Sequence, residues 1–274
     1  MKNIFLILIF SFFQLNGQIK FKSDFSIKNT PLQTKELGKS TTNIYYKVKF
    51  SNDSKSTSKR ETVCLLQVGK NISKFFDYNQ LRYDSIVQKY NHKDFLGAAE
   101  VEELLKIRVV WSNVIVKKDD TLTVQDRFKN LYQYDELKPD FNWKLEEGSK
   151  KILDYNCKKA TLEYGGRIYT AWYTKDIPIN NGPYKFEGLP GLILEMSDSK
   201  NDFVFEAVGI NNKPLPIYIR NDDKIFLVSK EKFRSIEVSY YENPAFFHGK
   251  AFDADGKELY KNSNKLPYNL IELK

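Results

Sequence analysis

The chemistry-bearing side chains of this sequence are concentrated in an aromatic and glycine-rich stretch near its middle. Arg167 supplies a guanidinium that can bind an anionic head group, and the aromatic rings after it can contact apolar chains. Residues 188–191 follow as a stiff loop, because glycine permits positive φ and Pro190 fixes its own φ. The residues predicted to line or shape a binding site are Arg167, Tyr169, Trp172, Tyr184, Gly188, Leu189, Pro190 and Gly191.

The same loop also has a structural interpretation. Its flanks are aliphatic and aromatic, which is typical of a rigid corner that turns Leu189 and Leu192 into the core. A ligand platform and a structural corner need the same backbone stiffness, so the sequence leaves both open.

Carboxylates offer the alternative chemistry of a hydrolase. Glu187 and Glu195 flank the stiff loop and would have to converge in one pocket. Strand alternation places Leu194 and Glu195 on opposite faces, which favours a solvent-facing Glu195. His92 and His248 stand in no ligand or nucleophile motif. The sequence therefore predicts no catalytic residues with any clear signature.

Soft ligands are scarce, since the chain has two His, two Cys and two Met. That count argues against a multi-ligand metal centre or a haem site, and we predict no metal and no cofactor. Cys64 and Cys157 both lie in apolar segments that have the residue pattern of strands. A disulfide between them and two separate buried thiols both remain open.

The composition is that of a globular, strand-rich protein. Among 274 residues, 41% are apolar and 15% aromatic, which favours a packed core and pleated surfaces. The net charge of +8 comes from 43 basic and 35 acidic residues, dispersed along the chain without a dense basic block. This pattern predicts no nucleic-acid partner and permits a weak attraction to anionic lipid.

The N-terminus has the pattern of a signal peptide. A basic leader precedes the apolar run at residues 4–13, which is shorter than the roughly 20 residues that a spanning helix needs. We expect a signal peptide at residues 1–17 and one β-rich domain at 18–274. The mature chain should have no transmembrane segment and should be exported to the periplasm, the cell surface or the medium.

The elements that must position these residues are mainly strands. Period-two alternation and turn residues predict strands at 42–50, 62–69, 108–116, 121–128, 132–134, 141–145, 155–164, 167–174, 192–196, 203–210, 225–228 and 236–241. Spacings of three and four between apolar residues predict helices at 75–90 and 93–106. Gly165 and Gly166 predict a tight hairpin, and residues 253–256 predict a turn. Short connections imply mostly antiparallel pairing.

The segment GLPGLILE at residues 188–195 resembles the signature of the GLPGLI family of exported Bacteroidota proteins. Supporting resemblances are Cys157-Lys158-Lys159-Ala160, Ala171-Trp172-Tyr173 and the closing Asn269-Leu270-Ile271-Glu272-Leu273. The last of these has Leu270 where the family's pattern has proline. The resemblance implies export and a shared fold. It implies no activity, because the family is functionally uncharacterised.

Together these patterns predict a mainly β fold. We expect a curved antiparallel sheet or incomplete barrel, with a few helices packed across its concave face, similar in architecture to lipoprotein carriers. The function that fits best is a non-enzymatic envelope protein that binds a lipid, a lipoprotein or another envelope component. The alternatives are a structural partner of an outer-membrane transporter or secretion assembly, and a carboxylate-dependent hydrolase.

Overall fold

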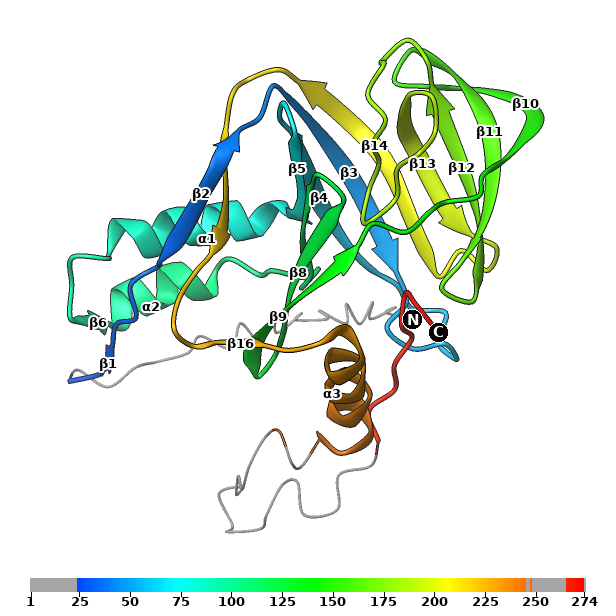
Figure 1. Ribbon diagram of the computed structural model, residues 1–274. Helices are drawn as coiled ribbons and strands as arrows, with labels where there is room; N and C mark the ends of the chain where they lie inside the picture. The colour runs from blue at the N-terminus through cyan, green and yellow to red at the C-terminus, as the bar shows by residue number, and fades with distance from the viewer. Residues whose placement is uncertain (1–23, 245–246, 248–264, 274) are drawn as a thin grey trace, which may run out of the picture.

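The fold is built on one large open sheet (Figure 1). A computed structural model describes residues 24–244, 247 and 265–273, and the predicted signal peptide, His248 and the predicted turn at 253–256 lie outside these residues. Within them the twelve-stranded order is β10 (Lys144–Ile152), β11 (Tyr155–Tyr164), β12 (Arg167–Thr174), β13 (Leu192–Asp198), β14 (Phe203–Asn211), β3 (Thr42–Phe50), β4 (Arg60–Val68), β5 (Ile72–Asp77), β7 (Val114–Lys118), β8 (Thr121–Phe128), β9 (Asn130–Leu137) and β16 (Ile225–Leu227).

Pairing in this sheet is antiparallel, except that β16 runs parallel to β9. The end strands β10 and β16 do not pair with each other, so the sheet stays open. The prediction of a mainly β, open antiparallel sheet is confirmed. Two short ribbons accompany it, one formed by β1 (Ser26–Lys28) and β6 (Phe95–Gly97), the other by β2 (Thr34–Lys39) and β15 (Pro216–Arg220).

One face of the sheet carries the main core. In β3 the alternation buries Ile44, Tyr46 and Val48, and cross-strand pairing places Cys64, Phe75 and Ile115 of the next strands on the same face. Apolar side chains of successive strands therefore meet in one continuous layer. The connection between β12 and β13, residues 175–191, packs its own rings into this layer.

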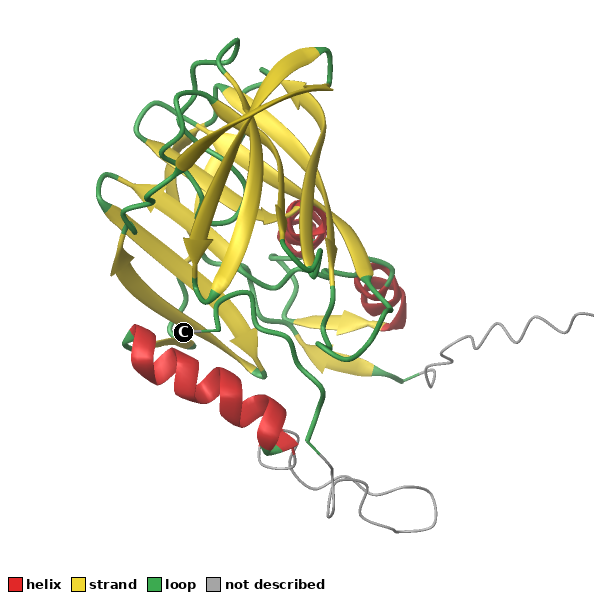
Figure 2. Cartoon of the chain, turned by 90° about the vertical axis from the view of Figure 1, so that its right-hand side faces the viewer, coloured by secondary structure: helices red, strands yellow, loops and turns green. Residues whose placement is uncertain are grey.

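The helices lie on both faces of the sheet, whereas the sequence predicted them on one. Helix α3 (Lys230–Glu242) packs Phe233 against Phe128 and Tyr134 on the core face. Helices α1 (Tyr78–Lys89) and α2 (Ala98–Leu105) cover the other face, and α3 lies apart from them in Figures 1 and 2. A cavity lies between this face of the sheet and the helices and ribbon that cover it.

Several element predictions were wrong in detail. The strand predicted at 108–116 begins only at Val114, the strand predicted at 141–145 begins only at Lys144, and the helix predicted at 93–106 begins only at Ala98, after the short strand β6. The segment 236–241 belongs to α3, because Ser229 caps the helix by accepting from the Lys232 amide and the apolar residues of this segment also fit a spacing of three to four. The predicted helix at 75–90 starts only at residue 78. Its first residues continue β5, and the Asp77 side chain caps α1 by accepting from the Asn79 amide at 2.8 Å.

Candidate functional site

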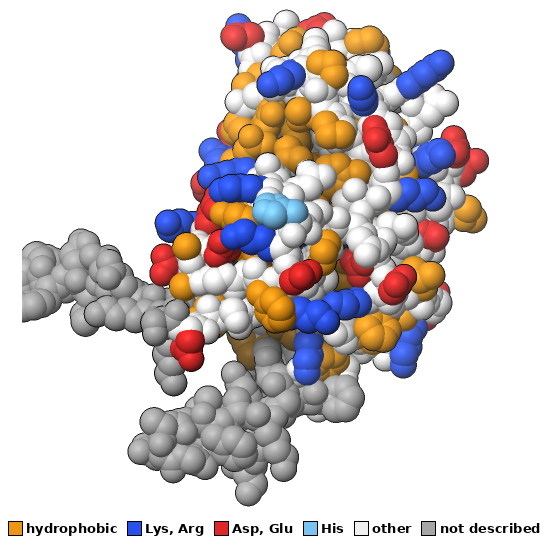
Figure 3. Space-filling model, turned by 90° about the vertical axis from the view of Figure 1, so that its left-hand side faces the viewer, with side chains coloured by type: hydrophobic (Ala, Val, Ile, Leu, Met, Phe, Trp, Pro, Cys, Tyr) orange, Lys and Arg blue, Asp and Glu red, His pale blue; other side chains and the backbone are white. Residues whose placement is uncertain are grey.

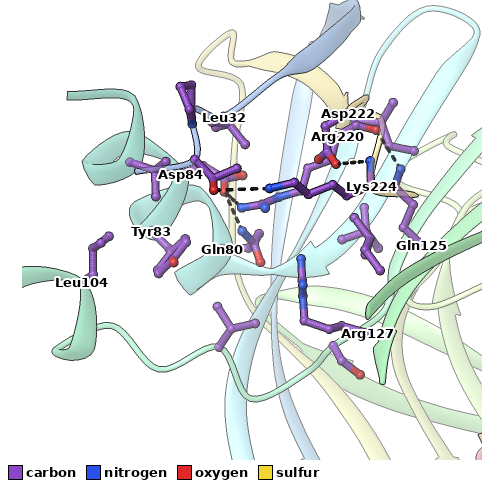
Figure 4. A pocket seen from close by; sticks show the side chains of 18 of the residues that line it. Leu32, Gln80, Tyr83, Asp84, Leu104, Gln125, Arg127, Arg220, Asp222 and Lys224 are labelled. Carbon is purple, nitrogen blue, oxygen red and sulfur yellow. Dashed lines mark hydrogen bonds and ion pairs between the residues drawn. The ribbon is translucent and has the colours of Figure 1, made fainter. Parts of the chain in front are cut away.

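A cavity of about 800 Å³ lies on the face of the sheet opposite the core. Four parts of the fold enclose it: strands of the sheet, α1 with α2, the β2–β15 ribbon, and the chain leading into β2 (Figure 4). Its apolar walls include Ile27, Leu32, Tyr83, Val87, Leu96, Leu104, Ile107, Val109, Val114, Leu131 and Ile219. A cavity of this size suits a small organic ligand.

Strand alternation explains which sheet residues reach this cavity. Lys74 lies between the core residues Ser73 and Phe75 in sequence, and Arg127 lies between Asp126 and Phe128. Because neighbours on a strand point to opposite faces, every second residue of β5 and β8 is directed away from the core, and Lys74, Gln125 and Arg127 among them line the cavity.

Side-chain amides fix the β15 ribbon above the sheet. Gln67 donates to the Pro216 carbonyl at 3.2 Å, and Gln125 donates to the Arg220 carbonyl at 2.8 Å. Both glutamines are buried on the outer face of the sheet. These bonds hold the ribbon at a fixed height, which keeps the cavity open beneath it.

Asp84 on α1 connects the helix to the same ribbon. One carboxylate oxygen accepts from Gln80 at 2.6 Å and from the Arg220 guanidinium at 2.8 Å. The other accepts from the Tyr218 hydroxyl at 3.1 Å. Asp84 is buried, and burial together with the neighbouring carboxylate raises the pKa of Tyr218. The hydroxyl is therefore a hydrogen-bond donor at neutral pH.

Lys74 is a buried cation in the wall of the cavity. Its ammonium lies 4.0 Å from the centre of the Phe76 ring and 4.2 Å from that of Tyr218. Burial lowers the pKa of Lys74 to about 7, opposed by the negative charge of Asp84. The two rings stabilise the charged form through their negative faces.

The charge around the cavity is predominantly positive. Its basic residues are Lys28, Lys74, Arg127, Lys129, Arg220 and Lys224, and its acidic residues are Asp84 and Asp222. Charges of one sign around a partly enclosed space concentrate their field within it. The arrangement attracts anions.

Exposed apolar side chains lie beside the lining residues. Ile27 is itself part of the lining, Phe95 precedes Leu96 of the lining, and Leu105 follows Leu104. Their exposed fractions are 43%, 60% and 58%. On the face that carries α1 and α2, hydrophobic side chains are interspersed with basic and acidic ones (Figure 3). This mixture fits contact with an amphipathic surface.

The residues predicted from the sequence lie elsewhere, on the core side. Arg167 is buried and forms ion pairs with Asp198 at 2.8 Å and Asp202 at 3.2 Å. Its guanidinium also donates to the Leu270 carbonyl at 2.7 Å. All these partners are parts of the protein, so Arg167 ties the C-terminal segment to the sheet.

Tyr169 and Tyr184 also hold that segment. The Tyr169 hydroxyl donates to the Ile271 carbonyl at 3.1 Å, and the Tyr184 hydroxyl donates to the Glu272 carboxylate at 2.6 Å. Lys185 lies 2.5 Å from the same carboxylate and 2.5 Å from Glu136. Sequence inspection missed this buried cluster because its members come from four distant segments.

The stiff loop is anchored at its glycines and at Leu189. A side chain on Gly191 would place its Cβ 2.0 Å from the Thr174 carbonyl oxygen, and Gly188 has φ +100° with Trp143 beside it. Leu189 and Leu192 are buried in the core, as the structural-corner interpretation predicts. A second hollow of about 390 Å³ is lined by Pro178, Asn180, Gly188, Leu189, Pro190 and Gly191.

Trp172 points to the opposite face from Tyr169 and Ala171, since it alternates with them on β12. The Lys150 ammonium lies 5.8 Å from the centre of its ring. None of the eight predicted residues lines the large cavity. A role of these eight residues in ligand binding therefore stays a prediction, and it concerns the surface of the loop at residues 188–191.

The two loop acids are each paired with lysine. Glu187 lies 3.1 Å from Lys138, and Glu195 lies 2.5 Å from Lys150. Each acid is therefore engaged with an ammonium group of the protein. Convergence of the two acids in one catalytic pocket stays a prediction.

The two cysteines and His92 do not line the cavity or the hollow at the loop. Cys64 and Cys157 are buried free thiols, and burial raises the pKa of both, that of Cys157 to about 11. His92 is exposed. The described residues contain no group of His, Cys, Asp and Glu side chains arranged to hold a metal ion. Their helices are also too short or too polar to cross a bilayer.

Comparison with known proteins adds family information for one segment. A family model for a Bacteroidota-associated domain, described as a protein of unknown function (Porph_ging), matches residues 165–195. This segment contains the GLPGLILE motif and Arg167, which agrees with a relationship to an uncharacterised family. No curated protein matches the chain.

Similarities to solved structures are weak, and they include two structures of one protein and one of another. Two structures of PNGF-II align at 15% and 14% identity over 73% of this chain, with TM-scores of 0.47 and 0.46. They cover 33% and 32% of the other chain, so this protein spans about a third of PNGF-II. A LolA superfamily protein from Nitrosomonas europaea aligns at 10% identity over 69% of this chain and 90% of its own, with a TM-score of 0.25.

Proposed function

We propose that this protein is an exported, non-enzymatic binding protein that holds an amphipathic component of the cell envelope, such as a lipid or the lipid part of a lipoprotein, in the cavity beneath α1 and α2. The observation that supports this proposal is the cavity of about 800 Å³ with apolar walls and a surplus of basic residues. Export rests on the leader pattern of residues 1–17.

The apolar walls supply the driving force for binding a hydrocarbon tail. Val87, Leu96 and Leu104 come from α1, β6 and α2 and line one side of the space. Burying apolar area contributes roughly 25 cal/mol per Å². A tail of modest length thus has sufficient contact for specific retention.

The fixed ribbon and the buried Asp84 cluster make the cavity a preformed site. Its roof is held by the Gln67 and Gln125 amides, and its helical wall is held by the Asp84 contacts with Arg220 and Tyr218. A preformed site binds more tightly than one that must be ordered by its ligand.

The test is to identify what the cavity retains. Delipidated protein is incubated with an envelope extract, re-purified, and examined by mass spectrometry for acyl species. The Leu104→Trp variant places a large ring in the cavity wall and should lose most of the bound species.

A matched control is Leu145→Trp on β10, where the side chain is 65% exposed and β10 contributes nothing to the cavity. This variant should bind as the unmodified protein does. Absence of acyl species from the unmodified protein, or equal retention by the Leu104→Trp variant, would contradict the proposal.

A further inference from the structure

The lining of the cavity includes the Arg127 guanidinium, which forms no ion pair with any residue in the described part of the chain. We propose that the cavity selects molecules with an anionic head group on an apolar tail, and that the Arg127 guanidinium binds that head group. This inference rests on the proposed function and specifies the chemistry of its ligand.

The position of Arg127 carries the argument. It lies on β8 between Asp126 and Phe128, which face the core, and its side chain extends from the strand into the cavity (Figure 4). Its guanidinium forms no hydrogen bond or ion pair within the described residues, and the side chain is exposed to solvent. A guanidinium that points into a cavity can donate two parallel hydrogen bonds to a carboxylate or a phosphate.

Two other cations of the cavity lining already have partners within the protein. Arg220 donates to Asp84 at 2.8 Å. Lys74 lies between the rings of Phe76 and Tyr218. Arg127 is consequently the arginine of the lining that is available for a ligand.

The electrostatic surroundings favour an added anion. Partial burial and the positive charge of Arg220 both lower the pKa of Arg127, and Asp222 opposes them only in part. The negative charge of Asp126 on the core face and the Tyr83 side chain on α1 likewise raise the pKa of Arg127 in part. An anion in the cavity would relieve the repulsion between the two guanidinium groups.

The apolar wall lies across the space from this charge. Leu104 and Arg127 occupy opposite sides of the cavity in Figure 4. A head group held at the sheet side thus leaves its tail directed toward α1 and α2, where the aliphatic residues lie. Head and tail are recognised by different walls, which gives selectivity for both parts.

The experiment compares decanoate and decanol as competitors of the neutral dye N-phenyl-1-naphthylamine, with inorganic phosphate as an anion without a tail. The unmodified protein should bind decanoate about tenfold or more tightly than decanol. The Arg127→Gln variant should lose this preference and bind decanol unchanged. The Arg127→Lys variant should keep part of this preference for decanoate, because lysine retains the positive charge but lacks the planar guanidinium that binds a carboxylate through two hydrogen bonds.

Arg82→Gln is the matched control, since Arg82 is an exposed residue of α1 outside the cavity lining. It should keep the full preference. Equal preference in the Arg127→Gln variant, or competition by phosphate as strong as by decanoate, would overturn the inference. If neither decanoate nor decanol competes in the unmodified protein, the proposed function itself has failed, which is a separate outcome.

Discussion

The buried carboxylate of Glu272 offers the sharpest test of the structure, because it should make stability depend on pH in a defined window. It accepts from Tyr184 at 2.6 Å and lies 2.5 Å from the Lys185 ammonium and 3.6 Å from that of Lys230. Desolvation by burial opposes its ionisation, but Lys185 and these hydrogen bonds outweigh it and lower the pKa of Glu272 to about 2 from 4.5.

The magnitude follows from that pKa difference. One pKa unit corresponds to about 1.4 kcal/mol, so the ionised Glu272 contributes about 3 kcal/mol to the free energy of unfolding. Since the folded-state pKa is depressed, this contribution is complete above pH 4.5 and is lost as the pH falls toward 2. The Glu272→Gln variant should therefore be about 3 kcal/mol less stable than the unmodified protein at pH 7.

Urea denaturation followed by tryptophan fluorescence at several pH values measures this difference. The gap between the two proteins should shrink as the pH falls from 5 to 2, because the unmodified protein then loses the same charge. Glu147→Gln on the exposed strand β10 is the control and should change stability by about 0.5 kcal/mol or less. A gap that is absent at pH 7, or that stays constant down to pH 2, would refute the reasoning.

Three further predictions concern the same core. Gly191→Ala should destabilise the fold by several kcal/mol, since its Cβ would lie 2.0 Å from the Thr174 carbonyl oxygen, and a fall in Tm measures this. Arg167→Met should cost about 3–5 kcal/mol in urea denaturation because it leaves buried carboxylates without their cation, and a change within 1 kcal/mol would contradict the structure. Cys64 and Cys157 should resist alkylation under native conditions and react in denaturant, because both thiols are buried with raised pKa; rapid native labelling of either would count against their burial.

Strand positions were predictable from the sequence where local patterns carry the information. The alternation in β3 and the hairpin at Gly165 and Gly166 both depend on neighbours along the chain, and both are found in the structure. Residues 236–241 of α3 were predicted as a strand because a short apolar run fits both periods, and the packing of the helix on Phe128 and Tyr134 selects the helix.

The candidate site was not predictable in the same way. The residues that stood out by type, such as Arg167 and Tyr184, are used internally to hold the C-terminal segment. Arg127 lacks any local signal, since it is one of many charged residues alternating along a strand. Its availability depends on which other cations have partners, and those partners come from distant parts of the chain.

The sequence by itself determined that this protein is a β-rich globular domain with a leader pattern and a stiff glycine-proline corner, because composition, alternation and turn chemistry are local properties. Only the tertiary structure decided where a cavity would form and which charge would be left inside it. Five separated segments, residues 27–32, 74–87, 96–114, 125–131 and 218–224, must come together before that space exists. Their meeting is set by long-range packing, which no local pattern specifies.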